Sequence, residues 1–250
     1  MKTGNNTVLI TGGATGIGFA LAEAFVKAGN NVLICGRRRA KLEEAQQKLP
    51  NIQVRQCDLS KREDRESLCN WVKDRHDDLN ILVNNAGIQR GIDIRKGAAD
   101  LLRGEDEVQV NLIAPIHLAA YLTPLLLDKN EAAIVNVSSG LAFVPIAAVP
   151  VYCATKAGIH IFSVSLRHQL KGTAVRVFEV VPPAVDTELG GRSTGNSEQG
   201  YKGIPPSEVA AETMKALEDN EYEIVVGRAK GLVEGSRKAF ERTFRELNSW

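Results

Sequence analysis

The sequence predicts an α/β fold, with one doubly wound, parallel sheet of about seven strands and helices on both faces. Short runs of consecutive apolar residues alternate with longer segments of helical periodicity along almost the whole chain. This alternation is typical of buried parallel strands joined by right-handed crossover helices. The 250 residues show no break in composition and no internal repeat, so we expect one domain, residues 1–250, with a sizeable core.

The predicted elements follow one another in a regular order. The first strand is predicted at 7–10, and Leu21, Phe25 and Ala28 lie after it at helical spacing. The remaining strands are predicted at 32–35, 52–57, 81–83, 133–137, 175–181 and 223–226. Helical patterns lie between them at 42–49, 68–72, 105–127, 153–171 and 206–219. The C-terminal tail, 228–250, is expected to form at most a weakly amphipathic helix that makes a surface or partner contact.

Composition and charge exclude several classes of protein. The chain has 31 basic and 30 acidic side chains and a formal charge of +1, whereas nucleic-acid binding usually needs a strongly basic face. We find no apolar run of about 18 to 20 residues, the length of a membrane span, and no apolar stretch of a signal peptide. We therefore expect a cytoplasmic protein with no nucleic-acid or membrane partner. Four widely spaced cysteines are expected to be reduced thiols, and we predict no metal site: Cys35, Cys57, Cys69 and Cys153.

A glycine-rich segment, residues 11–18, lies directly after the first predicted strand and opens the first helix. Its glycines follow the pattern T-G-x-x-x-G-x-G rather than the strict G-x-G-x-x-G. Glycines let the backbone turn tightly and approach a pyrophosphate, and the helix N-terminus supplies N–H donors and the positive end of its dipole. An ordinary tight turn is the alternative, but the position between strand and helix favours cofactor binding.

Tyr152 and Lys156 are one helical turn apart and therefore share a helix face. A free phenol has a pKa of about 10, and a neighbouring cation lowers that pKa toward neutrality, which suits a proton donor and acceptor. The Y-x-x-x-K pattern is common by chance and alone favours an ordinary surface helix. Here, however, Ser139 precedes Tyr152 at the end of a predicted strand, and Asn111 lies in the preceding helical segment.

Taken together, these motifs resemble the short-chain dehydrogenase/reductase family in its compact single-domain form. The resemblance covers about residues 5–227, and the overall pattern is most similar to bacterial oxidoreductases associated with D-alanine–lipoteichoic-acid operons. It implies a Rossmann-type fold and an enzyme that transfers hydride between a nicotinamide cofactor and a ketone, aldehyde or secondary alcohol. The motifs that carry it are Thr11-Gly12 to Gly18, Asp58, Asn84-Asn85-Ala86-Gly87, Asn111, Ser139, and Tyr152 with Lys156.

The resemblance implies four catalytic residues. Tyr152 would protonate the carbonyl oxygen in reduction and act as the base in oxidation, while Ser139 would donate a hydrogen bond to the same oxygen. Lys156 would bind the nicotinamide ribose and lower the pKa of the tyrosine. Asn111 would lie at a helix kink and hold a water that links Lys156 to solvent. Ser138 is the alternative to Ser139, and the family's spacing to the tyrosine favours Ser139.

The resemblance also implies a set of cofactor contacts. Asp58 would accept from the adenine amino group, with Leu59 beside the ring; without the resemblance, Asp58 would be interpreted as a helix cap before Ser60. One departure puts the loop after the sixth strand in doubt, because Pro183 stands at the family's usual glycine position, fixes φ and removes an amide donor. The other expected contacts are Gly12, Ala14, Thr15, Gly16, Ile17, Gly18, Asn85, Ala86, Gly87, Tyr152, Lys156, Val185 and Thr187.

The end of the second predicted strand indicates which cofactor binds. Dinucleotide folds that select NAD carry an acidic residue there, which binds the ribose 2′-hydroxyl. Gly36 occupies that position here, and it is followed by Arg37 and Arg38, whose guanidinium groups suit a 2′-phosphate. We therefore expect NADP(H), with NAD less favoured, and we expect Arg37 to carry most of the discrimination. A solvated basic start to the next helix is the alternative.

The segment 141–150 runs between Ser139 and Tyr152 and carries no charge. It forms either core or subunit packing or an apolar wall of the substrate site, so we expect a small-molecule substrate with an apolar body. The polar, glycine-rich segment 190–200 is predicted to be a mobile loop that closes over the substrate. We also expect a homodimer or homotetramer built on the helices near 105–127 and 153–171. Burial against the sheet is the competing use of the interface residues, Leu118, Leu122, Ile159, Phe162 and Leu166.

Two other functions fit the same fold. One is a catalytically silent, NADP-binding sensor or scaffold, and the other is an isomerase or dehydratase. Such silent proteins typically lose the tyrosine or the lysine, and this chain keeps all four catalytic positions, which favours the enzyme.

Overall fold

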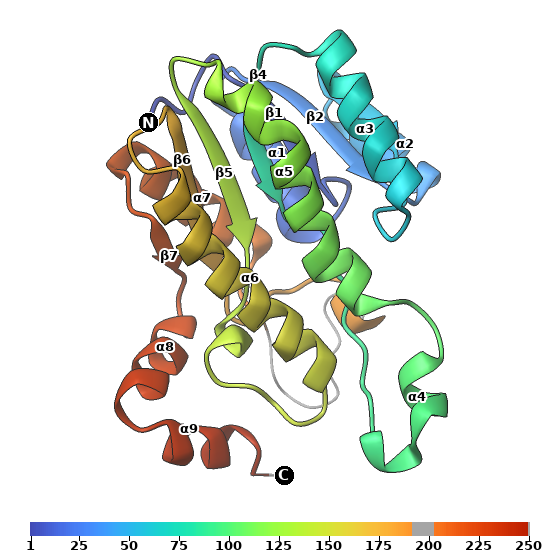
Figure 1. Ribbon diagram of the computed structural model, residues 1–250, viewed down its shortest axis with the longest axis vertical. Coiled ribbons are helices and arrows are strands. Elements are labelled where there is room, and N and C mark those ends of the chain that lie inside the picture. The colour runs from blue at the N-terminus through green and yellow to red at the C-terminus, as the bar shows by residue number, and fades with distance from the viewer. Residues whose placement is uncertain (192–202, 250) are drawn as a thin grey trace.

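The computed structural model describes residues 1–191 and 203–249, and in this part of the chain seven parallel strands form one sheet (Figure 1). The strand order is β3-β2-β1-β4-β5-β6-β7, so the chain builds one half outward from β1 and then returns to β4 to build the other half. The predicted fold class is confirmed. The strands are β1 (Thr7–Thr11), β2 (Asn31–Gly36), β3 (Gln53–Gln56), β4 (Leu79–Asn84), β5 (Ala132–Val137), β6 (Val175–Val181) and β7 (Glu223–Val225).

Helices cover both faces of the sheet (Figure 1). Short helical turns also occur at η1 (Ile94–Lys96), η2 (Gln109–Ile113), η3 (Gly140–Ala142) and η4 (Leu189–Gly191). The α-helices of the described chain are α1 (Gly16–Lys27), α2 (Arg39–Lys48), α3 (Arg62–Arg75), α4 (Ala98–Leu102), α5 (Ala114–Leu127), α6 (Pro150–Gln169), α7 (Pro206–Asp219), α8 (Ala229–Lys238) and α9 (Phe240–Leu247).

The two faces of the sheet have separate apolar cores, because successive side chains of a strand point to opposite sides. Val8 and Ile10 of β1 pack in a cluster with side chains of α1, α2 and α7. Leu9, between them, packs in the other cluster with α3, α5 and α6. Both faces of the central strands are therefore buried, which explains why these strands are continuously apolar in the sequence.

The predicted helix at 105–127 is divided in the structure. Residues 109–113 form a single π-helical turn, η2, and α5 follows it. Pro115 lacks an N–H, and a proline ring collides with the carbonyl group four residues earlier, which here belongs to Asn111. The resemblance implied a kink at Asn111, and the structure has this π-helical turn there, a feature that commonly marks a kink and that Pro115 favours.

The same segment, Gln109–Leu127, corrects one expectation. It is long and apolar enough, by length and composition alone, to cross a membrane, although the sequence was expected to hold no such run. Leu118, Leu122 and Leu126 are fully buried in the core between α5 and the sheet. The segment is therefore packed as the core helix of a globular protein is.

Candidate active site

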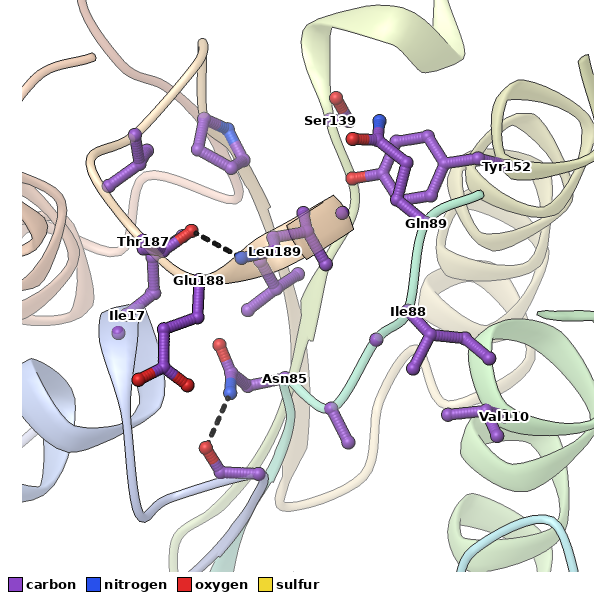
Figure 2. Close-up of a pocket in the computed structure, with 18 of the residues that line it drawn as sticks. Ile17, Asn85, Ile88, Gln89, Val110, Ser139, Tyr152, Thr187, Glu188 and Leu189 are labelled. Carbon is purple, nitrogen blue, oxygen red and sulfur yellow. Dashed lines mark hydrogen bonds between the residues drawn. The ribbon is translucent and has the colours of Figure 1, made fainter. Parts of the chain in front are cut away.

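A cleft of about 880 Å³ lies at the carboxyl ends of β1, β4, β5 and β6 (Figure 2). The strand order reverses its direction between β1 and β4, and open α/β sheets bind their ligands at such a topological switch point. Gly18 and Asn111 do not line this cleft. The other predicted site residues do, namely Gly12, Ala14, Thr15, Gly16, Ile17, Arg37, Arg38, Asp58, Leu59, Asn85, Ala86, Gly87, Ser139, Tyr152, Lys156, Val185 and Thr187.

The loop between β1 and α1 depends on glycines for its conformation and its close packing. Gly12 and Gly16 have φ values of +63° and +55°, which side chains disfavour. A Cβ on Gly12 would lie 2.9 Å from the Cα of Ala86, and one on Gly16 would lie 2.9 Å from Cγ2 of Thr187. Because α1 begins at Gly16, its first N–H groups lie at the edge of the cleft, an arrangement that can hold a phosphate group.

Gly18 and Asn85 hold this loop in place. A Cβ on Gly18 would lie 2.3 Å from the carbonyl oxygen of Gly12, so the glycine permits close packing of the helix against the loop. The Asn85 side-chain amide donates to the carbonyl oxygens of Thr11 and Gly12, at 2.9 and 3.3 Å, and Figure 2 shows Asn85 at the wall of the cleft. Asn85 was expected to contact the cofactor, and its amide nitrogen is already engaged by the loop.

The two arginines at the end of β2 each form an ion pair with a glutamate that also lines the cleft. Nη1 of Arg37 contacts Oε1 of Glu105, and Nη1 of Arg38 lies 2.9 Å from Oε2 of Glu188. Arg38 also donates to Oγ1 of Thr15 at 3.4 Å. Both arginine side chains remain about half exposed, so a ligand in the cleft can reach them.

Asp58 lines the cleft and also has the capping role that its sequence position allowed. Its Oδ1 accepts hydrogen bonds from the backbone N–H of Ser60 at 3.1 Å and from its hydroxyl at 2.8 Å. Burial alone would raise the pKa of Asp58, but these bonds, with the charges of Lys61 and Arg37, lower it. The carboxylate is therefore kept ionised at the edge of the cleft.

Tyr152 and Lys156 lie one turn apart on α6, and both are at least 95% buried. Nζ of Lys156 lies 5.7 Å from the centre of the Tyr152 ring and donates to the carbonyl oxygen of Val137 at 2.8 Å. Burial lowers the pKa of Lys156 to about 8, although the charge of Glu179 acts in the opposite direction. The side chains of Ser139 and Tyr152 project toward the same end of the cleft (Figure 2).

Asn111 lies behind this end of the cleft, and both polar atoms of its side chain form hydrogen bonds. Its Oδ1 accepts from the backbone N–H of Ile88 at 2.8 Å, and its Nδ2 donates to the carbonyl oxygen of Ile88 at 2.8 Å and to Oγ1 of Thr155 at 3.2 Å. A Cβ added to Gly87 would lie 3.5 Å from Asn111 Oδ1 and 3.6 Å from Nζ of Lys156. Asn111 Oδ1 and Nζ of Lys156 therefore both lie close to the space above Gly87, which a side chain there would fill.

Ser138 belongs to a buried polar network that sequence reasoning missed. Its hydroxyl donates to Oε1 of Glu179 at 2.5 Å, and Oε2 of that carboxylate lies 2.9 Å from Nδ1 of His160. Glu179 is 1% exposed, and its hydrogen bond raises the pKa of His160 against the effect of burial. This engagement distinguishes Ser138 from Ser139, whose Oγ accepts only from the backbone N–H of Leu141, at 3.1 Å, among the hydrogen bonds found for it in the described chain.

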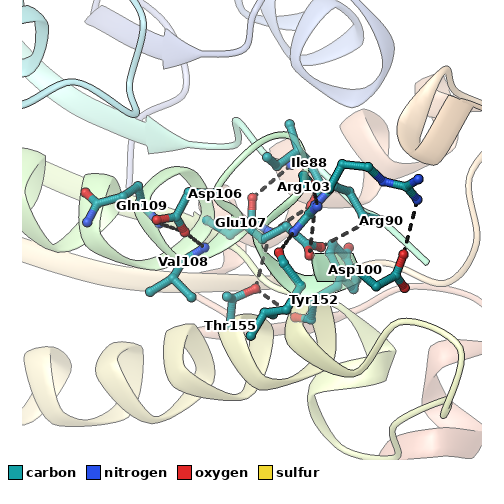
Figure 3. Close-up of polar contacts among 12 residues, drawn as sticks. Ile88, Arg90, Asp100, Arg103, Asp106, Glu107, Val108, Gln109, Tyr152 and Thr155 are labelled. Carbon is teal, nitrogen blue, oxygen red and sulfur yellow. Dashed lines mark hydrogen bonds and ion pairs between the residues drawn. The ribbon is translucent and has the colours of Figure 1, made fainter. Parts of the chain in front are cut away.

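A second buried carboxylate, Glu107, was also missed. It accepts from the backbone N–H of Arg90 at 3.1 Å and lies 3.6 Å from Nε of Arg90 (Figure 3). Burial raises the pKa of Glu107, partly offset by Arg90. Arg90 also donates to the carbonyl oxygens of Leu101 and Arg103, and it lines the cleft together with Gln89. These contacts tie the wall after β4 to the segment before η2.

The tail forms two helices rather than the single weak helix that was expected, and it reaches the cleft. Leu232 of α8 and Leu247 of α9 line the cleft, as do Leu141 and Ile146 of the segment 141–150. After α9, Oδ1 of Asn248 accepts from the backbone N–H of Ala147 at 2.6 Å, and its Nδ2 donates to the carbonyl oxygen of Pro145 at 3.0 Å. The tail and the uncharged segment thus form one apolar wall.

In the loops after β6, Val185 and Thr187 were expected to contact the cofactor despite Pro183, and residues 190–200 were expected to close over the substrate. Val185 pairs with Ile204 in a bridge, and the backbone N–H of Asp186 donates to the Ile204 carbonyl at 2.9 Å. Pro183 lines the cleft, and Val185 and Thr187 still reach it. The predicted substrate loop, 190–200, lies from residue 192 onward outside the described residues.

Most of the apolar residues that were expected in a subunit interface are buried within the chain, which corrects that assignment. Burial within the chain prevails: Leu118, Leu122 and Leu166 are buried in the core beside the sheet, Phe162 packs against that core partly buried, and Ile159 is 2% exposed. The exposed apolar side chains of the same helices are Ile161 at 62%, Val164 at 46% and Leu127 at 43%.

The sheet order, the glycine-rich loop and the Tyr152–Lys156 helix at the switch point define an oxidoreductase of the short-chain dehydrogenase class. The model of the short chain dehydrogenase family matches residues 6–197. The chain therefore belongs to this family, as the motifs predicted.

Known proteins resemble the chain over most or all of its length. It is 48% identical to the uncharacterized oxidoreductase DltE of Bacillus subtilis (strain 168), covering 100% of this chain and 99% of that protein. It is 32% identical to the NADP-dependent 3-hydroxy acid dehydrogenase YdfG of Escherichia coli O6:H1, covering 71% and 72%. A short-chain dehydrogenase from Burkholderia phymatum, in complex with NAD, has a TM-score of 0.83 at 19% identity, covering 99% and 97%.

Proposed function

We propose that this protein is an NADP(H)-dependent oxidoreductase that interconverts a ketone or aldehyde and the corresponding alcohol. The observation that carries the proposal is the placement of Ser139, Tyr152 and Lys156 in one cleft with a glycine-rich loop and two arginines. A nicotinamide cofactor, when bound, supplies or accepts the hydride. The glycine-rich loop fits such a group, because Gly12 and Gly16 line the cleft beside the first turn of α1, whose free N–H groups suit a phosphate, and a Cβ at either glycine would collide with Ala86 or Thr187.

The residues of the chain position the carbonyl oxygen and move its proton. Tyr152 donates a proton to this oxygen in reduction and removes it in oxidation, and Ser139 donates a hydrogen bond to it. The ammonium of Lys156, 5.7 Å from the phenol ring, stabilises the phenolate left when the proton has gone. The polar atoms of the Asn111 side chain bind Ile88 and Thr155, and its Oδ1 can accept a second hydrogen bond, from a water that resupplies protons.

The preference for NADP(H) rests on the end of β2. No carboxylate stands at Gly36, while Arg37 and Arg38 reach the cleft and remain half exposed. A guanidinium gains more from a phosphate than from a hydroxyl, because it forms paired, charge-assisted hydrogen bonds. The relative YdfG is named as NADP-dependent, which supports the same choice.

The apolar wall supports a substrate with an apolar body. Leu141, Ile146, Leu232 and Leu247 meet there, and apolar side chains with a few polar groups are typical of small-molecule sites. We further propose a homodimer or homotetramer that covers the exposed apolar side chains of α5 and α6. Sedimentation at micromolar concentration tests the assembly, because a mass of one 27.1 kDa chain contradicts it.

The variant Tyr152→Phe tests the proposed chemistry. It keeps the ring and removes the proton donor, so we expect carbonyl reduction to fall by about 10²- to 10⁴-fold. The affinity for NADPH, measured by its fluorescence, should stay within about twofold of wild type, because the contacts that position the cofactor remain. Tyr222→Phe is the matched control, since Tyr222 is 40% exposed and lies outside the cleft. Turnover of Tyr152→Phe near that of the control would refute the role of Tyr152.

A further inference from the structure

The basic side of the cleft is already neutralised by carboxylates of the chain itself. Glu105, which pairs with Arg37, lies between α4 and η2, and Glu188, which pairs with Arg38, lies between β6 and η4. The third cation there, Lys41, pairs with Glu44 at 2.8 Å. Glu105 and Glu188 therefore reach the two arginines from two different walls of the cleft, and both also line it.

We propose that Glu105 and Glu188 are internal competitors of the cofactor's 2′-phosphate and set the selectivity between phosphorylated and unphosphorylated cofactor. This inference rests on the proposed NADP(H) preference. In the phosphate-free protein each carboxylate occupies the guanidinium that the phosphate needs, so binding of a 2′-phosphate exchanges one anion for another at Arg37 and Arg38. A ligand without the 2′-phosphate needs no such exchange.

The exposure of these pairs makes the exchange feasible. All four side chains are between 44% and 51% exposed, and ion pairs at such positions are weak and screened by salt. A phosphate carries more charge than a carboxylate and forms paired hydrogen bonds with a guanidinium. The phosphate therefore displaces the carboxylates from the guanidinium groups. Its affinity is lowered by the cost of breaking each ion pair and by repulsion from the released carboxylates.

Isothermal titration calorimetry with two probes tests the proposal. Adenosine 2′,5′-bisphosphate carries the 2′-phosphate, and 5′-AMP lacks it, so the ratio of their affinities isolates the 2′-phosphate from other charge effects. For Glu105→Gln and Glu188→Gln we expect this ratio to rise about threefold each, and about tenfold in the double variant. The gain should shrink as salt is raised from low to physiological concentration.

Glu43→Gln is the matched control. Glu43 pairs with Arg39 at 2.8 Å on the surface of α2, and neither residue lines the cleft. The control changes the net charge by the same amount as each test variant, and we expect it to leave the ratio unchanged.

The outcomes separate the two proposals. If wild type binds both probes equally, the proposed NADP(H) preference fails and the competition fails with it. If wild type prefers the bisphosphate but the ratio is unchanged in the test variants, or rises equally in Glu43→Gln, only the competition is overturned. A lower ratio in Glu188→Gln also overturns it, because Glu188 would then orient Arg38 for the phosphate.

Discussion

Replacement of Glu179 by glutamine is expected to destabilise the fold in a pH-dependent way. The carboxylate is 1% exposed and joins β6 to the end of β5 through Ser138 and to α6 through His160. Glutamine keeps the size and shape of the side chain but removes its charge. The variant therefore measures what the charge contributes to the network.

The expected magnitude follows from the two hydrogen bonds. A hydrogen bond to a charged group contributes about 1.5–3 kcal/mol and a neutral one about 1 kcal/mol, so the loss over both bonds is about 2 kcal/mol. For a chain of this size that corresponds to a fall in Tm of about 4–8 °C. The estimate applies at a pH where His160 is protonated.

The pH dependence has a definite sign. The hydrogen bond to Glu179 raises the pKa of His160, while burial opposes it, and the charges of Glu223 and Arg237 face the same ring. A group whose pKa is raised by folding contributes stability that is complete below its unfolded pKa, about 6.5 for histidine, and that is lost as the pH rises through the folded pKa. The deficit of Glu179→Gln should therefore be larger at pH 6 than at pH 9.

Urea unfolding followed by circular dichroism at pH 6 and pH 9 measures this. Glu223→Gln is the control, because this carboxylate also faces His160 but is 33% exposed and pairs with Arg237 at 3.0 Å. We expect the control to change stability by less than about 0.5 kcal/mol. A Glu179→Gln deficit as small as that of the control, or an equal deficit at both pH values, would refute the reasoning.

Three further predictions concern the cleft and its walls. Gly16→Ala should weaken binding of adenosine 2′,5′-bisphosphate at least about tenfold, because the new methyl group meets Thr187. Gly29 also has a positive φ but has open space around it, so Gly29→Ala should leave binding unchanged in the same titration. Asn248→Ala should raise KM for bulky apolar ketones about three- to tenfold with NADPH affinity unchanged, since it frees the tail from 145–147; an unchanged KM contradicts a shared wall. Because burial lowers the pKa of Lys156 to about 8, its ammonium is lost as the pH rises through that value, and kcat/KM for reduction should fall there. Lys156→Arg should move this fall in kcat/KM to higher pH. A pH profile that does not move would contradict the role of the charge.

Local patterns were sufficient for the fold and for the residues that meet at the strand ends. The carboxyl ends of parallel strands share one edge of a sheet, so the loop after β1, Asn85 after β4 and Ser139 after β5 had to converge. Helical spacing placed Tyr152 and Lys156 on one face of α6. The convergence of these segments needed only the order of the elements and the periodicity within each, whereas the choice of Asn85 and of Ser139 over Ser138 came from the family resemblance.

The partners of the site residues could not be predicted in the same way. Arg38 and Glu188 are 150 residues apart, and Asn248 and Pro145 are 103 apart, so no spacing rule connects them. The interface assignment failed for a related reason. Helical periodicity identifies an apolar face, but it does not say whether the sheet or a second protomer covers that face. In the structure the side chains of Leu118 and Leu122 are buried in the core beside the sheet.

One signal in the sequence could have led further. Strand β6 is almost wholly apolar except for Arg176 and Glu179, and a carboxylate in the interior of a buried strand needs a partner, because an unpaired buried charge is costly. The sequence therefore implied a donor facing Glu179, although not that the donor was His160, which lies on α6, 19 residues earlier. The network built from this pair fixes α6, which carries Tyr152 and Lys156, against the strand ends that carry Ser139. For this reason the charge of Glu179, which lies outside the lining of the cleft, is expected to control both the stability of the fold and the geometry of its proposed catalytic end.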